Sequence, residues 1–321
     1  MAFWCVFGLF NMWLAGLLAF HGDSDARTAF NTVYGTEQWG DAGGGSGSGS
    51  TLEFTRPTRH VLLSLLTKLE AGSMIDAPCG AMVWTAPFLR EDVPPVIPGF
   101  RYLGVDVVDS VMAANKQRFA AEKTWSFEHV DLSATVLPNG YDVIFSRDAF
   151  QHMPMEAVVQ ILRMMSQTDA KWLIAGSYDN GYNHRTTWGG PWYEIDLRKA
   201  PFNLDGNAEA VHEGGDKTFL VYNIQDYLRT VDFDQMAARE RAYWSLRSGQ
   251  CWAIALTLTA VLLLVWQRTT SGTNDSNRKN NPLCSLLFVC SWEEGLSCST
   301  QQLHHPVSNP EGAEGGAAHG I

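Results

Sequence analysis

The chain has 321 residues and a mass of 35.5 kDa, and 45% of its residues are hydrophobic while 18% are charged. That length and apolar content suffice for one large domain or two small ones, and they exclude a wholly disordered chain. Lys and Arg number 23 against 34 Asp and Glu, so the net charge is −11. An acidic chain does not attract phosphate backbones, and we do not expect a nucleic-acid partner.

The N-terminal segment, residues 1–22, carries no charged side chain. Its run Phe3–Phe20 approaches the roughly 20 residues that cross a bilayer, and small residues follow as they do near cleavage sites. We interpret 1–22 as a signal peptide or signal anchor, although the basic stretch that normally opens a signal is missing. The alternatives are a buried N-terminal helix and a start site placed too far upstream.

The middle of the chain, 23–246, contains near its start the sequence GGGSGSGS at 43–50, which by composition alone is typical of a flexible linker. After it, short apolar runs alternate with helical patterns, which predicts βαβ units and a parallel sheet. The predicted elements in chain order are a helix with its apolar face at Leu62, Leu63, Leu65, Leu66 and Leu69, a strand at Ser73–Asp76, a strand at Tyr102–Asp106, a helix at Ser110–Ala121, a strand at Tyr141–Ser146, a helix at Met155–Met165 and a strand at Lys171–Gly176.

A second uncharged segment, 248–267, is 20 residues long and is bracketed by Arg247 and Arg268. Trp252 and Trp266 lie near its ends, where interfacial aromatic residues are common, so we predict a transmembrane helix. This places the protein in a membrane, in the endomembrane system or at the cell surface, with the side of the membrane open. The tail 268–321 is rich in Ser, Asn, Gly and Pro, and we expect it to be disordered.

The first candidate site follows the strand that ends at Asp76, in the sequence IDAPCG. A strand that enters a tight glycine turn is a common place to bind a nucleotide-like ligand, because the backbone approaches the ligand closely where there is no Cβ. Gly80 has that position. The G-x-G-x-x-G fingerprint is absent, since Pro78 stands where its first glycine would be, and this disfavours an NAD(P)-dependent oxidoreductase.

Two further carboxylates follow strand ends. Asp106 comes 26 residues after Gly80, where an acidic residue can accept hydrogen bonds from both hydroxyls of a ribose. Asp131 follows a third strand, marked by Trp125 and Phe127, and could accept a hydrogen bond from an adenine amino group. We assign the next residues, Val107 and Leu132, to the same site. Either Asp could instead only cap a turn, but their order and spacing favour a nucleoside ligand.

A fourth group follows the strand at Tyr141–Ser146 and contains Arg147, Asp148 and His152. We predict that this turn faces the same crevice, with Arg147 among the residues that bind the ligand. The middle region offers no CxxC pair, since Cys79 is its one cysteine, and we predict no metal site.

Together these motifs resemble the class I methyltransferases that use S-adenosylmethionine (SAM), over roughly residues 30–235. The chain is most similar to a group of uncharacterised methyltransferase-domain proteins. The matching residues are Tyr34, Trp39 and Gly40; Ser46–Ser50; Asp76–Gly80; Gly104, Val105 and Asp106; Arg147, Asp148 and His152; and Asn183, Gly190, Leu197, Pro201 and Phe202. The resemblance implies a Rossmann-like, seven-stranded, mostly parallel sheet with helices on both faces, to which the terminal hydrophobic helices would be added.

The resemblance also implies SAM as cofactor and assigns the distal half of 43–50 to a loop that closes over it. Two departures concern the cofactor contacts: Ala81 stands where the group often carries an acidic residue, and Met82 replaces a glycine of the broader superfamily. Trp188, Trp192 and Tyr193 belong either to a substrate pocket or to the core.

Methyl transfer to a hydroxyl or an amine can need a base, and His152 is the first candidate because its ordinary pKa lies near neutrality. Asp148 is the second. Each has a structural alternative, since Asp148 could hold a loop and His152 could pack on the following helix. We therefore expect a membrane-tethered methyltransferase that acts on a small molecule, glycan or protein, or alternatively an inactive methyltransferase-like binding or scaffold protein. In either case Gly80, Asp106 and Asp131 should line one pocket, with His152 at its mouth.

Overall fold

A computed structural model describes residues 25–179, 182–206, 208–245, Thr257, 288–290 and 298–300. The two segments that we predicted to enter a membrane, 1–22 and 248–267, lie outside these residues apart from Thr257. Within the described part of the chain, none of the helices combines the length and the hydropathy that a membrane span requires.

Contacts divide the chain into two units, Met1–Gln250 and Cys251–Ile321. In the second unit, most of which lies outside the described residues, β8 (Phe288–Cys290) pairs antiparallel with β9 (Cys298–Thr300).

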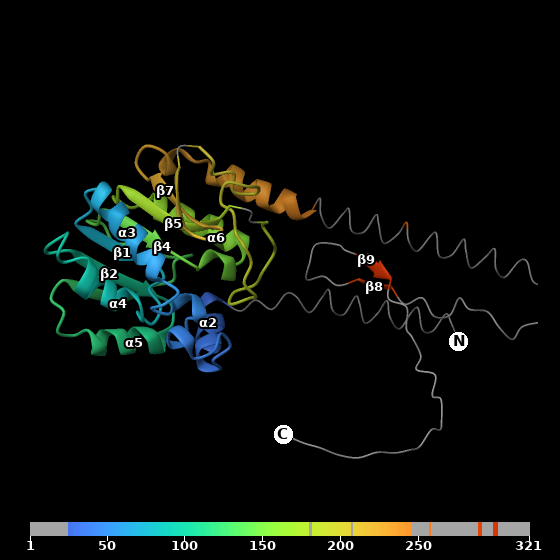
Figure 1. Ribbon diagram of the computed structural model, residues 1–321. Coiled ribbons are helices and arrows are strands. Elements are labelled where there is room, and N and C mark those ends of the chain that lie inside the picture. Colours follow the sequence, from blue (N-terminus) through green and yellow to red (C-terminus); the bar gives the residue numbers. More distant parts are fainter. Residues whose placement is uncertain are drawn as a thin grey trace, which may run out of the picture. The chain divides into compact units, whose positions relative to one another are not determined.

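The first unit is built on a seven-stranded sheet with the order β3-β2-β1-β4-β5-β7-β6 (Figure 1). Strands β1 to β5 run parallel, and β7 runs antiparallel to both β5 and β6. The strands are β1 (Ser73–Asp76), β2 (Arg101–Asp106), β3 (Trp125–His129), β4 (Val143–Ser146), β5 (Trp172–Tyr178), β6 (Glu209–Gly214) and β7 (Lys217–Asn223). This confirms the expected Rossmann-like, mostly parallel sheet of seven strands.

The strands alternate their apolar residues between two hydrophobic cores, one on each face of the sheet. Ile75 belongs to one core while its neighbour Met74 belongs to the other, and Ile144 and Phe145 divide in the same way. Because successive side chains of a strand point to opposite faces, a strand with both faces covered must be apolar throughout. The short apolar runs in the sequence are therefore strands buried on both sides.

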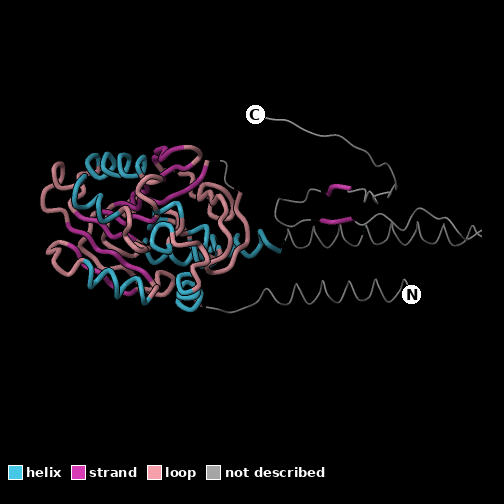
Figure 2. Tube along the Cα trace, turned by 60° about the horizontal axis from the view of Figure 1, so that its bottom comes forward, coloured by secondary structure: helices cyan, strands magenta, loops and turns pink. Residues whose placement is uncertain are grey.

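Helices cover both faces of the sheet, with the strands between them (Figures 1 and 2). The core on one face includes residues of α2 (Ala26–Gly35) and α6 (Met155–Ser166), and the core on the other includes residues of α3 (Arg56–Lys68). In α6, eight of the 12 residues are buried, so packing accounts for its stability. The remaining helices are α4 (Thr85–Pro87) and α5 (Asp109–Arg118), and residues 233–245 are also helical.

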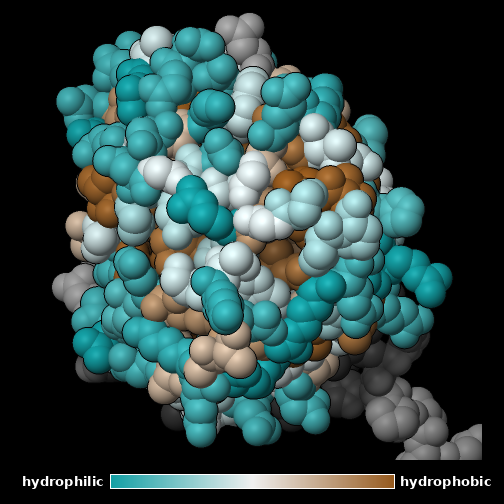
Figure 3. All heavy atoms as spheres, turned by 90° about the vertical axis from the view of Figure 1, so that its left-hand side faces the viewer, coloured by the Kyte–Doolittle hydropathy of each residue, from teal (hydrophilic) through white to brown (hydrophobic). Residues whose placement is uncertain are grey.

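Hydrophilic side chains predominate on the face of the molecule that Figure 3 shows, and hydrophobic residues appear there only in scattered patches. That distribution is ordinary for a folded domain, whose surface always retains some apolar atoms.

The expectation of a flexible linker at 43–50, which rested on composition, is wrong. These residues belong to two short 3-10 turns, Ala42–Gly45 and Ser48–Ser50, packed against the domain. The turn after β1 leads into α4, a single helical turn, and then into a π-helical turn at Phe88–Asp92. Two strands of the sheet, β6 and β7, have no counterpart among the elements that we placed from the sequence.

Candidate functional site

A pocket of about 950 Å³, partly open to solvent, lies at the carboxyl ends of β1, β2 and β4. The strand order reverses between β1 and β4, which is where open α/β sheets bind their ligands. All the residues that we assigned to the site line this pocket, namely Asp76, Gly80, Asp106, Val107, Asp131, Leu132, Arg147, Asp148 and His152. The geometric prediction is therefore confirmed: residues far apart in sequence meet at one edge of the sheet.

Asp106 binds the glycine turn directly. One carboxylate oxygen, Oδ2, accepts the N–H of Gly80 over 2.9 Å, and Oδ1 accepts the N–H of Val108 over 3.0 Å. Burial raises the pKa of Asp106, and these backbone N–H groups oppose that shift. A carboxylate offers about four lone pairs, so Asp106 retains acceptor capacity for a ligand beyond these backbone contacts.

Asp76 lies deeper, at the end of β1, and is 3% exposed. Its Oδ2 accepts a hydrogen bond of 2.8 Å from the hydroxyl of Tyr102 on the neighbouring strand. Burial raises the pKa of Asp76 to about 7, although the hydrogen bond from Tyr102 and the charge of Arg147 oppose that shift. Asp76 therefore changes its charge near neutral pH, which an exposed carboxyl does not do.

Asp131 and its neighbour Leu132 follow β3 across a short connection. The Oδ1 atom of Asp131 accepts from both the N–H and the hydroxyl of Ser133, at 2.9 and 2.7 Å, so the side chain fixes its own turn. Its other oxygen, Oδ2, receives no hydrogen bond from the described residues. Val107, partly buried, and Leu132, buried, add apolar surface to the same end of the pocket.

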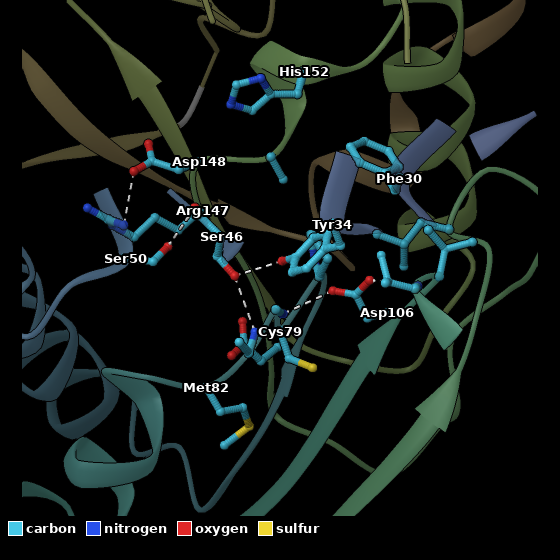
Figure 4. A pocket seen from close by; sticks show the side chains of 18 of the residues that line it. Phe30, Tyr34, Ser46, Ser50, Cys79, Met82, Asp106, Arg147, Asp148 and His152 are labelled. Carbon is cyan, nitrogen blue, oxygen red and sulfur yellow. Dashed lines mark hydrogen bonds and ion pairs between the residues drawn. The ribbon is translucent and has the colours of Figure 1, made fainter. Parts of the chain in front are cut away.

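The glycine- and serine-rich turns at 42–50, which we call the strap, lie over the β1 turn. The Ser46 hydroxyl is 2.7 Å from that of Tyr34 and accepts the N–H of Ala81 over 3.3 Å (Figure 4). Gly44 has φ +68°, and a Cβ on it would lie 2.8 Å from the Cβ of Ala81. The strap contributes Gly43, Ser46 and Ser50 to the lining of the pocket. This position is consistent with the cofactor-covering loop that the sequence resemblance implied for the distal half of 43–50.

Arg147 is buried, and its guanidinium is occupied by protein groups. Its Nε donates to Glu213 on β6 over 2.7 Å, and its Nη1 donates to the carbonyl of Gly49 over 3.1 Å. Nη1 also lies 2.9 Å from the carboxylate of Asp148. Arg147 thus joins the strap to the edge of the sheet, and a direct contact with the cofactor stays a prediction.

Asp148 is held by more partners than a base would normally have. Lys217 donates to its Oδ2 over 2.6 Å, and Tyr178 and Gln151 donate to its Oδ1 over 3.2 and 3.1 Å. Although burial opposes it, the charges of Arg147 and Lys217 lower the pKa of Asp148. A carboxylate that is paired and ionised in this way accepts a proton poorly, so the geometry favours the structural alternative for Asp148.

His152 lies in the 3-10 turn Phe150–His152 that follows β4. Its Nδ1 is 2.9 Å from the carbonyl oxygen of Gly190, and its ring stacks at a tilt on Trp39 with centroids 4.5 Å apart. A carbonyl can only accept, so Nδ1 carries the proton and Nε2 of the neutral ring is an acceptor. Burial lowers the pKa of His152 below its ordinary 6.5. The side chain is therefore a neutral base at pH 7.

Ala81 and Met82, the two positions that differ from the pattern of the methyltransferases that the sequence resembles, lie at the β1 turn. Met82 has φ +57°, a conformation that glycine adopts without cost, and its side chain is buried against Tyr102. Burial raises the pKa of the Cys79 thiol, which packs beneath the turn. Neither substitution closes the pocket, since both Ala81 and Met82 line it.

The aromatic residues at 188–193 were expected to belong either to a substrate pocket or to the core, and the structure shows that they do not all belong to one of these. Trp188 lines the pocket, Tyr193 is buried in the core and Trp192 is 52% exposed. Sequence reasoning missed Phe30 and Lys217. Phe30 lies within α2 at the spacing of an ordinary core residue, and Lys217 lies in a hairpin that no motif marks.

No protein-family model and no curated protein matches this sequence. Solved structures resemble it weakly. PigF with SAH is 16% identical, with a TM-score of 0.44, and the match covers 63% of each chain. Human N-acetylserotonin methyltransferase in complex with SAM is 15% identical, with a TM-score of 0.42 over 62% of this chain and 60% of that one. The methyltransferase domain of bacterial CtHen1 is 14% identical, with a TM-score of 0.38 over 52% of this chain and 98% of that one.

Proposed function

We propose that the protein is a SAM-dependent methyltransferase. The observation that carries this proposal is the joint placement of the Gly80 turn, Asp106 and Asp131 in one pocket at the reversal of strand order. Asp106 retains lone pairs for ribose hydroxyls, Oδ2 of Asp131 is available for an adenine amino group, and the single glycine offers no pyrophosphate loop.

The residues present fit this cofactor, which supplies an activated methyl group. Asp106 would orient the ribose, Asp131, Val107 and Leu132 would hold the base, and the strap would exclude water. The proposed acceptor is a small molecule or a macromolecule.

Isothermal titration calorimetry of the full chain tests the proposal, with SAM and NAD⁺ as ligands. We expect SAM to bind and NAD⁺ not to bind. A labelled methyl donor added to lysate fractions then tests transfer to lipid, glycan, protein and metabolite acceptors. SAM binding without transfer to any fraction would favour the alternative, an inactive methyltransferase-like scaffold, and failure to bind SAM would refute both.

We also propose attachment to a membrane through 248–267, on the basis of its 20 uncharged residues. Carbonate extraction of the full chain from membranes measures this directly. The protein should stay in the pellet, and its release into the soluble fraction would contradict the proposal.

A further inference from the structure

Four ring-bearing side chains form one side of the pocket and are called the aromatic wall here: Phe30, Trp39, His152 and Trp188. The centroid of the Phe30 ring lies 6.1 Å from that of Trp39 and 6.0 Å from that of Trp188, in edge-to-face arrangements. All four line the pocket. In Figure 4, Phe30 and His152 lie on the opposite side of the pocket from Cys79 and Met82.

We propose that the acceptor is a ring-bearing molecule methylated on a hydroxyl group, which is held against the aromatic wall with its hydroxyl at Nε2 of His152. This inference rests on the proposed function and names its substrate class. An apolar ring gains both buried area and edge-to-face contacts against such a wall.

The charges at the pocket disfavour a carboxylate acceptor. Arg147 is the cation among the described residues that line it, and Glu213 and Asp148 already bind its guanidinium. Lys217 is likewise bound to Asp148. With both cations paired, an acceptor carboxylate would lose its hydration without finding a partner.

The protonation state of His152 distinguishes a hydroxyl from an amine. A protonated alkylamine has no lone pair and must lose its proton before it attacks the methyl group. The neutral imidazole of His152 is too weak a base to remove that proton efficiently. A hydroxyl keeps its lone pairs and becomes strongly acidic only as the new bond forms. Nε2 of neutral His152 is an acceptor of suitable strength for that proton, and the Gly190 carbonyl fixes the required tautomer.

In the step itself, the acceptor oxygen forms a bond to the methyl carbon while the carbon–sulfur bond breaks on the opposite side. The electron pair of the broken bond stays on sulfur, which becomes a neutral thioether. The hydroxyl proton passes to Nε2, and the imidazolium later returns it to water. The products are a methyl ether and S-adenosylhomocysteine, and no further co-reactant is needed.

Three acceptors on one ring system test the proposal with the full chain and labelled SAM: 2-naphthol, 2-naphthylmethylamine, whose alkylamine is protonated at neutral pH, and 2-naphthoate. We expect transfer to 2-naphthol at least tenfold faster than to the other two. His152→Gln should slow that transfer about 100-fold and leave SAM affinity unchanged. His60→Gln, which alters an exposed histidine on α3, is the matched control and should keep the wild-type rate.

A binding measurement gives a second readout that does not need turnover. With S-adenosylhomocysteine bound, 2-naphthol should quench tryptophan fluorescence, and Trp188→Leu should weaken its binding at least tenfold. Trp192→Leu changes an exposed tryptophan that does not line the pocket, and it should leave the affinity unchanged.

Several results would overturn the inference: preference for the amine or the carboxylate, full activity in His152→Gln, or failure of 2-naphthol both to bind and to accept a methyl group while SAM binds. Absence of SAM binding in calorimetry would instead refute the proposed function, and it is measured without any acceptor.

Discussion

Replacing Asp106 with alanine should weaken two properties at once, because its carboxylate has two sets of partners. In the protein it accepts the N–H groups of Gly80 and Val108, and in the proposed complex it also accepts ribose hydroxyls. The Ala variant leaves the buried N–H of Val108 and the partly buried N–H of Gly80 without this acceptor, at a cost of up to about 1–3 kcal/mol each. The sum is a substantial part of the roughly 5–15 kcal/mol that stabilises a typical domain.

Cofactor binding should fall at the same time. A hydrogen bond from a hydroxyl to a carboxylate contributes about 1.5–3 kcal/mol, so the loss of even one such bond lowers SAM affinity at least tenfold. Thermal unfolding of the free protein measures the first effect, and calorimetry with SAM at a temperature where the variant is folded measures the second.

Asp234→Ala is the matched control, because its side chain is 90% exposed and forms only a surface ion pair with Arg163. It should change stability by less than about 1 kcal/mol. If Asp106→Ala unfolded at the wild-type temperature and bound SAM with wild-type affinity, both the hydrogen-bond assignment and the ligand would be wrong.

Three further predictions concern the residues around the pocket. Asp76→Asn should stabilise the free protein at pH 8, by up to about 4 kcal/mol for a pKa raised from 3.8 to about 7. The wild type loses this stability as pH rises from about 4 to 7, because Asp76 ionises at lower pH in the unfolded chain than in the folded protein. In urea unfolding the gain in the Asn variant should therefore vanish near pH 4. An equal gain at pH 8 and pH 4 would contradict the raised pKa of Asp76. Lys217→Met breaks a partly buried pair with Asp148, whose second cationic partner Arg147 remains, and should cost about 1.5–3 kcal/mol in urea unfolding. Because the pKa of Asp148 is lowered, the cost should stay constant from about pH 8 to 5 and shrink only below about pH 4, where Asp148 becomes protonated. A cost that had vanished already at pH 6 would show that it does not come from the charge pair of Lys217 and Asp148. Gly44→Ala should reduce SAM affinity more than Gly40→Ala, because both glycines have positive φ but only Gly44 would bring a Cβ against Ala81; equal affinities in calorimetry would show that the strap does not cover the cofactor.

The sequence predicted β1, β2, β4 and β5 well because these strands are largely buried on both faces and therefore mostly apolar, whereas the exposed edge strand β3 was marked only by Trp125 and Phe127. The strand at Ser73–Asp76 has the predicted bounds, and β2 begins one residue before its prediction. The edge strand β6 was not placed, because polar residues such as His212 and Glu213 leave it without a continuous apolar run, whereas β7 was missed although it carries the buried run Phe219–Tyr222.

The site was predictable as far as position after a strand end determines it. Gly80, Asp106 and Asp131 needed only the rule that parallel strands present their carboxyl ends at one edge. Pairing partners were not predictable, because they come from elsewhere in the fold. Asp148 could be taken for a base only while Lys217, 69 residues later, was not known to bind it.

The two cores on opposite faces of the sheet separate the aromatic wall from the packing beneath the glycine turn. Phe30, Trp39 and Trp188 pack with the core that contains Ile75, whereas Cys79 and Met82 beneath the glycine turn pack with the core that contains Met74. A substitution that reshapes the aromatic wall therefore disturbs little of the packing that supports the turn. Under the proposed function, changes in the layer of the aromatic wall would alter the acceptor site while the turn at Gly80 keeps its shape.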